Sequence, residues 1–270
     1  MIFVTGFGQM CNNILQFGHF YAWGRESGID VIAMRFCYKY SFFEINKKKT
    51  YNWFTYLFAK YGAKMKCFPT VAFDDEQSMV PERMDLLKES KFVMVQGWFM
   101  RNYELFLKYR SEITELFQFN KKVCQSVNLL FSHFPETDLT LGVHIRRGDY
   151  IRWQEGKYFF QDEDYCSFIS SFLELHPEKT VQVLIATNDP RINPETFRSK
   201  INVPVHFLSG SAGEDLCALS RCDYLIGPPS TFSLMASFYE DIPLYWVFDK
   251  DEKIVSDSFQ KFEALFRNII

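Results

Sequence analysis

Short runs of β-branched and aromatic residues alternate with stretches of helical periodicity, and this alternation limits the possible fold more than any other feature of the sequence. Such an alternation is typical of parallel sheets covered by helices, so we expect an α/β protein. The pattern predicts strands at residues 2–5, 30–36, 91–96, 139–145, 181–186, 203–208, 223–226 and 243–247. It predicts helices at residues 12–27, 102–119, 121–134, 162–175, 214–222, 230–239 and 256–266.

A break around Pro135 divides the chain into two halves of similar size. The expected architecture is two Rossmann-like, doubly wound domains facing each other across a cleft. The first would cover residues 1–137, the second residues 138–255, and a closing helix residues 256–270. The aromatic and lysine-rich stretch 37–79 shows no clear period, so no element is assigned within it.

Composition excludes several classes of protein. The 270 residues carry a formal net charge of −3, whereas nucleic-acid binders usually have a basic excess. No stretch approaches the roughly 20 apolar residues of a membrane span, so any membrane contact would be peripheral, at the inner face. Seven cysteines without a C-x-x-C pair, and no secretory signal, predict reduced thiols in a cytoplasmic protein.

Polar and charged residues follow four of the predicted strands in the second half. These segments are residues 144–150, 186–190, 209–213 and 227–233. Ligands bind at the carboxyl ends of strands in open α/β sheets, so the four segments are expected to line one pocket.

Arg146 and Arg147 follow the strand at 139–145 directly, with His144, Asp149 and Tyr150 around them. Guanidinium groups match phosphate oxygens and carry a fixed charge. That charge is needed where a nucleoside diphosphate leaves a sugar, because negative charge grows on the departing phosphate. Asp149 is expected to orient an arginine through paired hydrogen bonds. The alternative is a surface salt-bridge pair.

Ser230, Thr231 and Ser233 open a predicted helix after a glycine and two prolines. Backbone N–H groups and hydroxyls at a helix N-terminus suit a phosphate. Ser230 would also serve as a simple helix cap, and the two roles are compatible.

Two acidic segments complete the expected pocket. Asp215, next to Glu214, would accept two hydrogen bonds from a guanine edge, with ordinary helix capping as the alternative. Asn188 and Asp189 stand at a strand end before a proline, where turn formation is the alternative to ligand binding.

The sequence predicts no metal site and no cofactor. The segment Asp162-Glu163-Asp164 resembles the metal-binding Asp-x-Asp motif of many transferases, but it begins a predicted helix, and capping explains it better. The five histidines are scattered, which disfavours zinc.

The N-terminal turn around Gly6 and Gly8 matches the dinucleotide-binding pattern G-x-G-x-x-G only in part, because Cys11 takes the third position. Its glycines would allow close approach of a sugar or of a facing domain. Gly8, Gln9, Asn12 and Asn13 are therefore candidates for acceptor contacts in the cleft, with helix capping as the alternative for Asn12.

Four segments in one order resemble a known family. His144–Asp149 fits the pattern His-x-Arg-Arg-x-Asp, and Gln96–Phe99, Ile185–Pro190 and Asp215–Ser233 are similar to its other motifs. The resemblance is to the α1,2-fucosyltransferases of bacteria and animals, glycosyltransferase family 11, and more distantly to the α1,6- and protein O-fucosyltransferases. Two segments depart from it: Gly8–Asn13, and Gly227-Pro228-Pro229 before the last Ser-Thr-Phe-Ser.

The resemblance implies a GT-B fold and an inverting, metal-independent transfer of fucose from GDP-fucose. By position, Arg146 and Arg147 would hold the β-phosphate with Asp149 bracing them, and Asp215 would face guanine with His144 nearby. Ser230, Thr231 and Ser233 would close around the diphosphate. Asp149 and Glu155 are the candidate general bases.

The acceptor implied by the resemblance is a galactoside or other glycan hydroxyl, including lipid-linked glycans, in surface polysaccharide synthesis by a bacterial enzyme. Two alternatives remain open. One is a GT-B transferase that uses another sugar nucleotide, and the other is a non-catalytic nucleotide- or sugar-binding protein.

Overall fold

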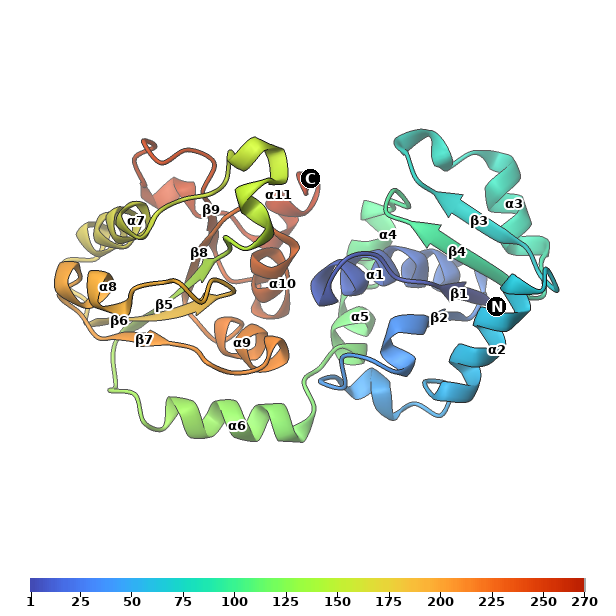
Figure 1. Cartoon of the computed structure of the whole chain (residues 1–270), viewed down its shortest axis with the longest axis horizontal. Coiled ribbons are helices and arrows are strands. Elements are labelled where there is room, and N and C mark those ends of the chain that lie inside the picture. Colours follow the sequence, from blue (N-terminus) through green and yellow to red (C-terminus); the bar gives the residue numbers. More distant parts are fainter. Residues whose placement is uncertain (270) are drawn as a thin grey trace. The chain divides into compact units, whose positions relative to one another are not determined.

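The computed structural model describes residues 1–269 and divides them into two compact units (Figure 1). The first ends at Lys122 and the second begins at Val123. Helix α6 (Lys121–Phe131) thus belongs almost wholly to the second unit, although it precedes the boundary predicted at residue 137. No helix within residues 1–269 is both long and apolar enough to cross a membrane.

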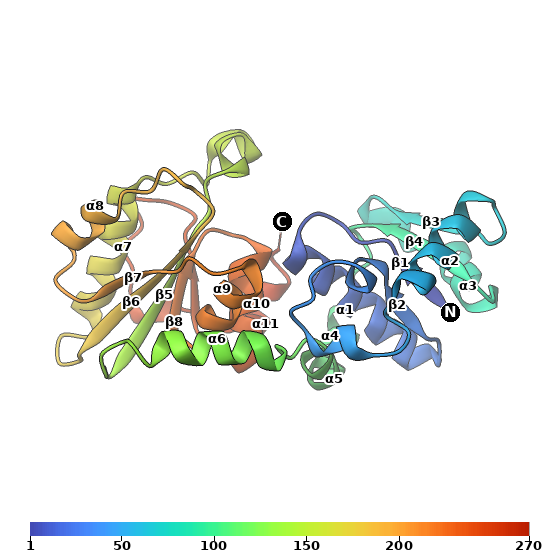
Figure 2. The same ribbon diagram turned by 60° about the horizontal axis from the view of Figure 1, so that its bottom comes forward.

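The first unit is built on a four-stranded sheet in the order β2-β1-β4-β3, in which every pairing is parallel. Its central strand β1 is fully buried. Helices α1 and α4 pack together on one face, and α2 lies on the other (Figures 1 and 2). The strands are β1 (Ile2–Val4), β2 (Val31–Ala33), β3 (Thr70–Phe73) and β4 (Val93–Gly97). The α-helices are α1 (Met10–Ser27), α2 (Trp53–Lys64), α3 (Pro81–Glu89), α4 (Tyr103–Lys108) and α5 (Arg110–Leu116). Short 3-10 helices are η1 (Met34–Cys37), η2 (Glu44–Lys47) and η3 (Glu76–Ser78).

Two predicted elements of this unit were wrong in extent. The strand expected over 30–36 ends at Ala33, because the chain turns there into η1. The helix expected over 102–119 is two helices, since Tyr109 takes φ −101° and ψ 17° and its hydroxyl bonds the Glu26 carboxylate on α1. By contrast, α1 ends as predicted at Gly28, which adopts the left-handed conformation with φ 68°.

The second unit holds a five-stranded, fully parallel sheet in the order β7-β6-β5-β8-β9. Helices α7 and α8 cover one face, and α9, α10 and α11 cover the other (Figures 1 and 2). The strands are β5 (Leu139–Ile145), β6 (Val181–Thr187), β7 (Val205–Phe207), β8 (Tyr224–Gly227) and β9 (Leu244–Trp246). The helices are α7 (Asp162–Leu175), α8 (Pro194–Lys200), α9 (Ala212–Leu219), α10 (Thr231–Glu240) and α11 (Phe262–Phe266), with 3-10 helices η4 (Asp149–Ile151), η5 (Trp153–Gly156) and η6 (Ser256–Ser258).

The closing helix predicted over 256–266 was wrong. Only Phe262–Phe266 is α-helical, and Ser256–Ser258 is a separate 3-10 turn. Between them Gln260 exchanges backbone hydrogen bonds with Leu244 at 2.9 and 3.0 Å, so the chain pairs with β9 instead of continuing as a helix. The α/β class and the parallel sheets are confirmed.

Candidate functional site

The strand order of the second unit identifies one edge of its sheet as the place for a ligand. From β5 the chain moves outward to β6 and β7, then returns to the other side of β5 for β8 and β9. A crevice forms where such an order reverses, outside the carboxyl ends of the two strands. Here those strands are β5 and β8, which end at Ile145 and Gly227. The arginine pair and the Ser230 segment therefore follow the two strands of the switch point.

Arg146 is held by a bidentate pair with Asp149. Its Nε and Nη2 donate to the two carboxylate oxygens at 3.1 and 2.6 Å, and its guanidinium lies 5.0 Å from the centre of the Tyr150 ring. These hydrogen bonds lower the pKa of Asp149, so its carboxylate stays ionised. The side chain of Arg146 keeps 20% of its surface exposed, which leaves it accessible to a ligand.

Arg147 has a different environment, since its side chain is only 5% exposed. Its Nη1 forms an ion pair with Asp162 at 2.6 Å and lies 3.8 Å from Asp189, and its Nε donates to the Phe160 carbonyl at 2.7 Å. A guanidinium so enclosed by two carboxylates fixes the loop against α7 and β6. The surface salt-bridge alternative is wrong for this residue, and Asp149 braces Arg146 alone.

Asn188 and Asp189 shape the same loop from the end of β6. The Asn188 side-chain oxygen accepts from the backbone N–H groups of Arg147 and Gly148 at 3.0 and 3.4 Å. Asp189 accepts from the backbone and side chain of Arg191 at 3.1 and 3.0 Å, and these bonds lower its pKa. The alternative of a turn at Asp189 is confirmed, and both side chains position the arginine loop.

His144 lies beneath the switch point with 7% of its surface exposed. Burial, and to a smaller extent the positive charge of Arg146, lowers the pKa of His144 to about 3. The ring is therefore neutral at physiological pH. Its Nδ1 has no hydrogen-bond partner within residues 1–269, and its ring packs 4.8 Å from that of Phe232. A neutral imidazole with an unpaired nitrogen is able to bond a ligand.

The α10 N-terminus stands opposite, at the end of β8. Ser230 caps it by accepting from the Phe232 N–H at 3.0 Å, which confirms the predicted cap. Ser233 is buried and donates to the Pro228 carbonyl at 3.0 Å, and Thr231 is 7% exposed. Tyr150 donates to the Pro229 carbonyl at 2.9 Å, which ties this loop to the arginine loop. The hydroxyls of Ser230 and Ser233 are thus engaged in building the turn, and the helix N-terminus remains the feature suited to an anion.

Asp215 lies in the first turns of α9, after β7. The capping role belongs to its neighbour Glu214, whose carboxylate accepts from the Ser211 N–H at 2.8 Å. Burial raises the pKa of Asp215 to about 7. The carboxyl group is therefore poised between its two protonation states near neutral pH.

The four N-terminal candidates differ in their exposure and in their hydrogen bonds. Asn13 is buried, and its side chain bonds both the N–H and the carbonyl of Phe7 at 3.1 and 3.0 Å, so it holds the turn together. Gly8 and Gln9 are exposed, and Gln9 is the N-cap residue, so the capping alternative for Asn12 was wrong. Asn12 is half-buried in the first turn of α1.

Two contributions to these sites were missed from the sequence. Phe7, 44% exposed after β1, stacks on buried Trp98 after β4 with ring centroids 5.3 Å apart, which holds one exposed ring beside the N-terminal turn. Asp162 is the partner of Arg147, a role that no local pattern signals because the residues come from different elements.

The three carboxylates of Asp162-Glu163-Asp164 contact protein groups and are not arranged around a common point where a metal ion would bind. Asp162 pairs with Arg147, Glu163 lies 3.4 Å from Lys200, and Asp164 accepts from the Gln161 N–H at 2.7 Å in a capping box. Within residues 1–269 no group of three or more His, Cys, Asp or Glu side chains is arranged to hold a metal ion. The predicted capping of α7 is confirmed, and metal independence stays a prediction.

Comparison with protein families decides the classification. The profile described as "Glycosyl transferase family 11" matches residues 94–242, more than half of the chain. The chain belongs to glycosyl transferase family 11. The matched segment of this family 11 chain runs from β4 to the end of α10 and includes every candidate donor residue named above, whereas the N-terminal turn lies outside it. No curated protein matches the chain.

Solved structures with a similar fold include a fucosyltransferase and proteins in complex with GDP or GDP-fucose. A mutant of Arabidopsis thaliana FUT1 in complex with GDP has a TM-score of 0.66 at 14% identity, over 96% of this chain and 73% of that one. POFUT1 in complex with GDP-fucose scores 0.57 at 11% identity, over 89% and 93% of the chains. NodZ alpha-1,6-fucosyltransferase soaked with GDP-fucose scores 0.57 at 14% identity, over 91% and 94%. The family 11 chain thus has a GT-B-type fold built of Rossmann-like units.

Proposed function

We propose that this family 11 chain transfers L-fucose from GDP-fucose to a glycan hydroxyl with inversion at the anomeric carbon. The observation that carries the proposal is Arg146, paired bidentately with Asp149 at the β5/β8 switch point. Relatives of the same fold were solved with GDP or GDP-fucose, which supports the choice of donor.

In the proposed reaction the bond between the anomeric carbon and the β-phosphate oxygen breaks, and its electron pair leaves with GDP. Arg146 and the N-terminus of α10 stabilise the charge that grows on the β-phosphate, so no metal is required for that step. The acceptor hydroxyl attacks from the opposite face of the sugar and loses its proton. Arg147 acts through its ion pairs with Asp162 and Asp189 by keeping Arg146 in place.

The pairing of Asp149 with Arg146 argues against Asp149 as the general base, because its lowered pKa makes the carboxylate a weak proton acceptor. Glu155 is the remaining candidate. It is exposed and stands in the left-handed conformation with φ 59°, next to Gln154 at φ 50°. Such strain in non-glycine residues is often retained at functional loops.

For the acceptor we propose a galactoside modified in α1,2 linkage, in the synthesis of surface polysaccharide or glycan at the cytoplasmic side of a membrane. Gly8, Gln9 and Asn12, with the Phe7–Trp98 ring pair, are the proposed contacts of the first unit with that acceptor.

Thermal-shift measurements with GDP, UDP, ADP and CMP test the donor. Stabilisation by GDP alone is expected, and stabilisation by UDP but not GDP would overturn the fucose assignment. GDP binding without release of fucose to water or to any galactoside would favour a non-catalytic binding protein. Activity in the presence of a chelator tests the metal-free step, which fails if activity is lost and Mn²⁺ restores it.

A further inference from the structure

Helix α2 in the first unit packs with its small residues inward and exposes its large ones. Ala59 is fully buried, and a side chain added at Gly62 would overlap the ring of buried Phe68. By contrast, Phe54 is 85% exposed and Trp53 57%, and Met65, directly after the helix, is 71% exposed. A surface helix of a globular protein normally shows the reverse arrangement. Phe58 packs against the rings of Phe3 and Phe68, but the exposure of Trp53 and Phe54 is not explained by the core.

The exposed side chains share one face of the helix. The aromatic–lysine face consists of Trp53, Phe54, Leu57, Tyr61 and Met65, together with Lys60 and Lys64. At 100° per residue the apolar members span a single arc of about 120°, with Lys64 inside this arc and Lys60 just beyond it. The ring of Tyr38 stacks on that of Trp53 with centroids 5.6 Å apart, and this contact holds the tryptophan in an exposed position.

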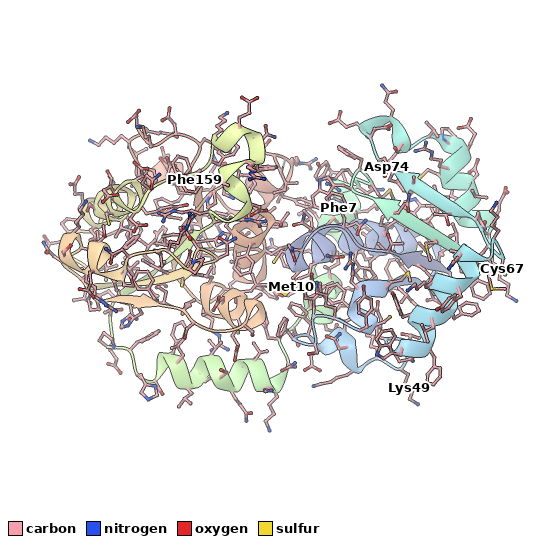
Figure 3. The ribbon with its side chains drawn as sticks, viewed as in Figure 1. Phe7, Met10, Lys49, Cys67, Asp74 and Phe159 are labelled. Atoms are coloured by element: carbon pink, nitrogen blue, oxygen red, sulfur yellow. The ribbon has the colours of Figure 1, made fainter. Side chains whose placement is uncertain are left out.

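The surroundings of this face are strongly basic. Residues 37–66 contain seven lysines and one glutamate, although the whole chain carries a formal net charge of −3. Lys47, Lys48 and Lys49 are exposed in the segment that leads into α2, and Lys66 is exposed just beyond it. Figure 3 labels Lys49 and Cys67, which lie beyond the two ends of the helix.

We propose that the aromatic–lysine face of α2 binds an anionic phospholipid surface, so that the chain is a peripheral membrane protein. An amphipathic helix with Trp, Phe and Leu on one face and lysines beside them lies in the plane of a membrane interface. Its apolar side chains enter the headgroup region, and Tyr and Trp favour that depth. The lysines attract anionic headgroups, each by a factor of about five in affinity.

The charge of the face argues against a second copy of the chain as the occupant. A two-fold contact places the same surface on both sides, so the lysines of one copy would lie against the equally lysine-rich face of the other. Only Glu44 is acidic within residues 37–66, and it already pairs with Lys47 at 2.6 Å. An anionic lipid surface removes this repulsion, whereas a second copy would increase it.

Sedimentation of the purified chain with vesicles tests the proposal, and it does not depend on which donor the enzyme uses. Vesicles of phosphatidylcholine mixed with phosphatidylglycerol should bind the chain, with binding weakened by salt. Vesicles of phosphatidylcholine alone should bind it much more weakly. The double variant Lys60→Glu/Lys64→Glu should lower affinity by about 30-fold or more. The double variant Phe54→Ser/Met65→Ser should lower it by about tenfold or more.

Matched controls come from α6, away from α2 in the sequence. Lys121→Glu/Lys122→Glu makes the same charge change, and Leu129→Ser changes a leucine that is 63% exposed. Both controls should bind vesicles like the unchanged chain. All variants replace exposed side chains, and their melting temperatures show that each remains folded.

Three results would overturn the proposal. One is equal binding to vesicles by the α2 variants and the controls. The second is binding that is independent of phosphatidylglycerol and salt. The third is a dimer in solution that Phe54→Ser/Met65→Ser dissociates while vesicle binding is absent, which would assign the face to a second copy.

Discussion

Arg146 and Arg147 are neighbours in one loop, yet their surroundings predict opposite consequences for the same substitution. Arg146→Ala should lower kcat by about 10³-fold with little change in melting temperature, because it removes charge from the leaving phosphate. Arg147→Ala should destabilise the fold by about 3 kcal/mol, because Asp162 and Asp189 lose their buried partner. Kinetics of transfer together with thermal melts separate the two effects.

Arg191→Ala is the matched control, since Arg191 also pairs with Asp189 but its side chain is 68% exposed. It should change stability by less than about 1 kcal/mol. If Arg147→Ala melts like the unchanged chain, the positioning role assigned to the buried ion pairs is wrong.

The raised pKa of Asp215 predicts that GDP binding depends on pH. Its pKa is raised to about 7 by burial, and only the carboxylate form accepts both hydrogen bonds from a guanine edge. GDP affinity should therefore rise about tenfold between about pH 6 and pH 8, measured by titration calorimetry. Asp215→Asn should bind GDP more weakly at pH 8 and without this pH dependence. An unchanged profile in that variant would remove Asp215 from the guanine site.

The same residue makes a prediction about stability. Its folded-state pKa lies above that of an unfolded aspartate, so its contribution is fully present below about pH 4 and is lost as pH rises through about 7. Asp215→Asn, which stays neutral, should raise the melting temperature at pH 8 more than at pH 4. The free-energy gain at pH 8 is on the order of 2 kcal/mol or less. Melts of both proteins at the two pH values, without nucleotide, check the sign.

At the scale of elements, the Tyr150 hydroxyl connects the loops that follow the two strands of the switch point. The Tyr150 hydroxyl donates to the buried Pro229 carbonyl at 2.9 Å. Tyr150→Phe keeps the ring beside Arg146 and removes this bond together with the hydrogen bond between the Tyr150 and Ser230 hydroxyls. It should cost about 1 kcal/mol in unfolding free energy and weaken GDP binding several-fold, because the two loops lose their connection. Denaturant unfolding and calorimetry measure these effects, and undiminished GDP affinity would mean that β8 positions its loop alone.

Elements in the second unit were predictable from the sequence because the local residue patterns there match the burial of the side chains in the structure. The strand at Leu139–Ile145 and the helix at Asp162–Leu175 were predicted to the residue, the first as a buried apolar run and the second from its acidic first turn. In the first unit α2 was missed, because its apolar residues face outward and give no core-facing period. The closing helix was wrong because the Gln260–Leu244 pairing is a long-range contact that no local pattern contains.

The candidate site, like the fold, was predictable from the sequence only in part. The sequence predicted which strand ends carry polar residues, because strand direction alone brings the carboxyl ends of parallel strands to one edge. It did not predict that Arg147 is enclosed while Arg146 is accessible. That difference depends on Asp162 from α7 and Asp189 from the end of β6, both of which reach the loop only in the folded sheet.

At the scale of the whole molecule, the proposed donor residues all belong to one unit. From Val123 onward the described chain has its own five-stranded sheet and a buried core that includes Val143, Phe168 and Ile185. A unit with its own core is able to fold alone. Binding of the donor should therefore be separable from transfer of the sugar when the second unit is studied alone.

We predict that residues 123–270 expressed alone bind GDP with an affinity within about tenfold of the full chain, and transfer no fucose. Binding should persist because Arg146, Asp215 and the α10 N-terminus are all present, and transfer should be lost because the proposed acceptor contacts lie in the first unit. Calorimetry with GDP and an assay with GDP-fucose and a galactoside measure the two activities. The same fragment with Arg146→Ala serves as the control and should bind GDP more weakly. A fragment that shows a cooperative melt but no GDP binding would mean that the first unit also contributes to the donor site, and transfer by the fragment would exclude the first unit from acceptor recognition.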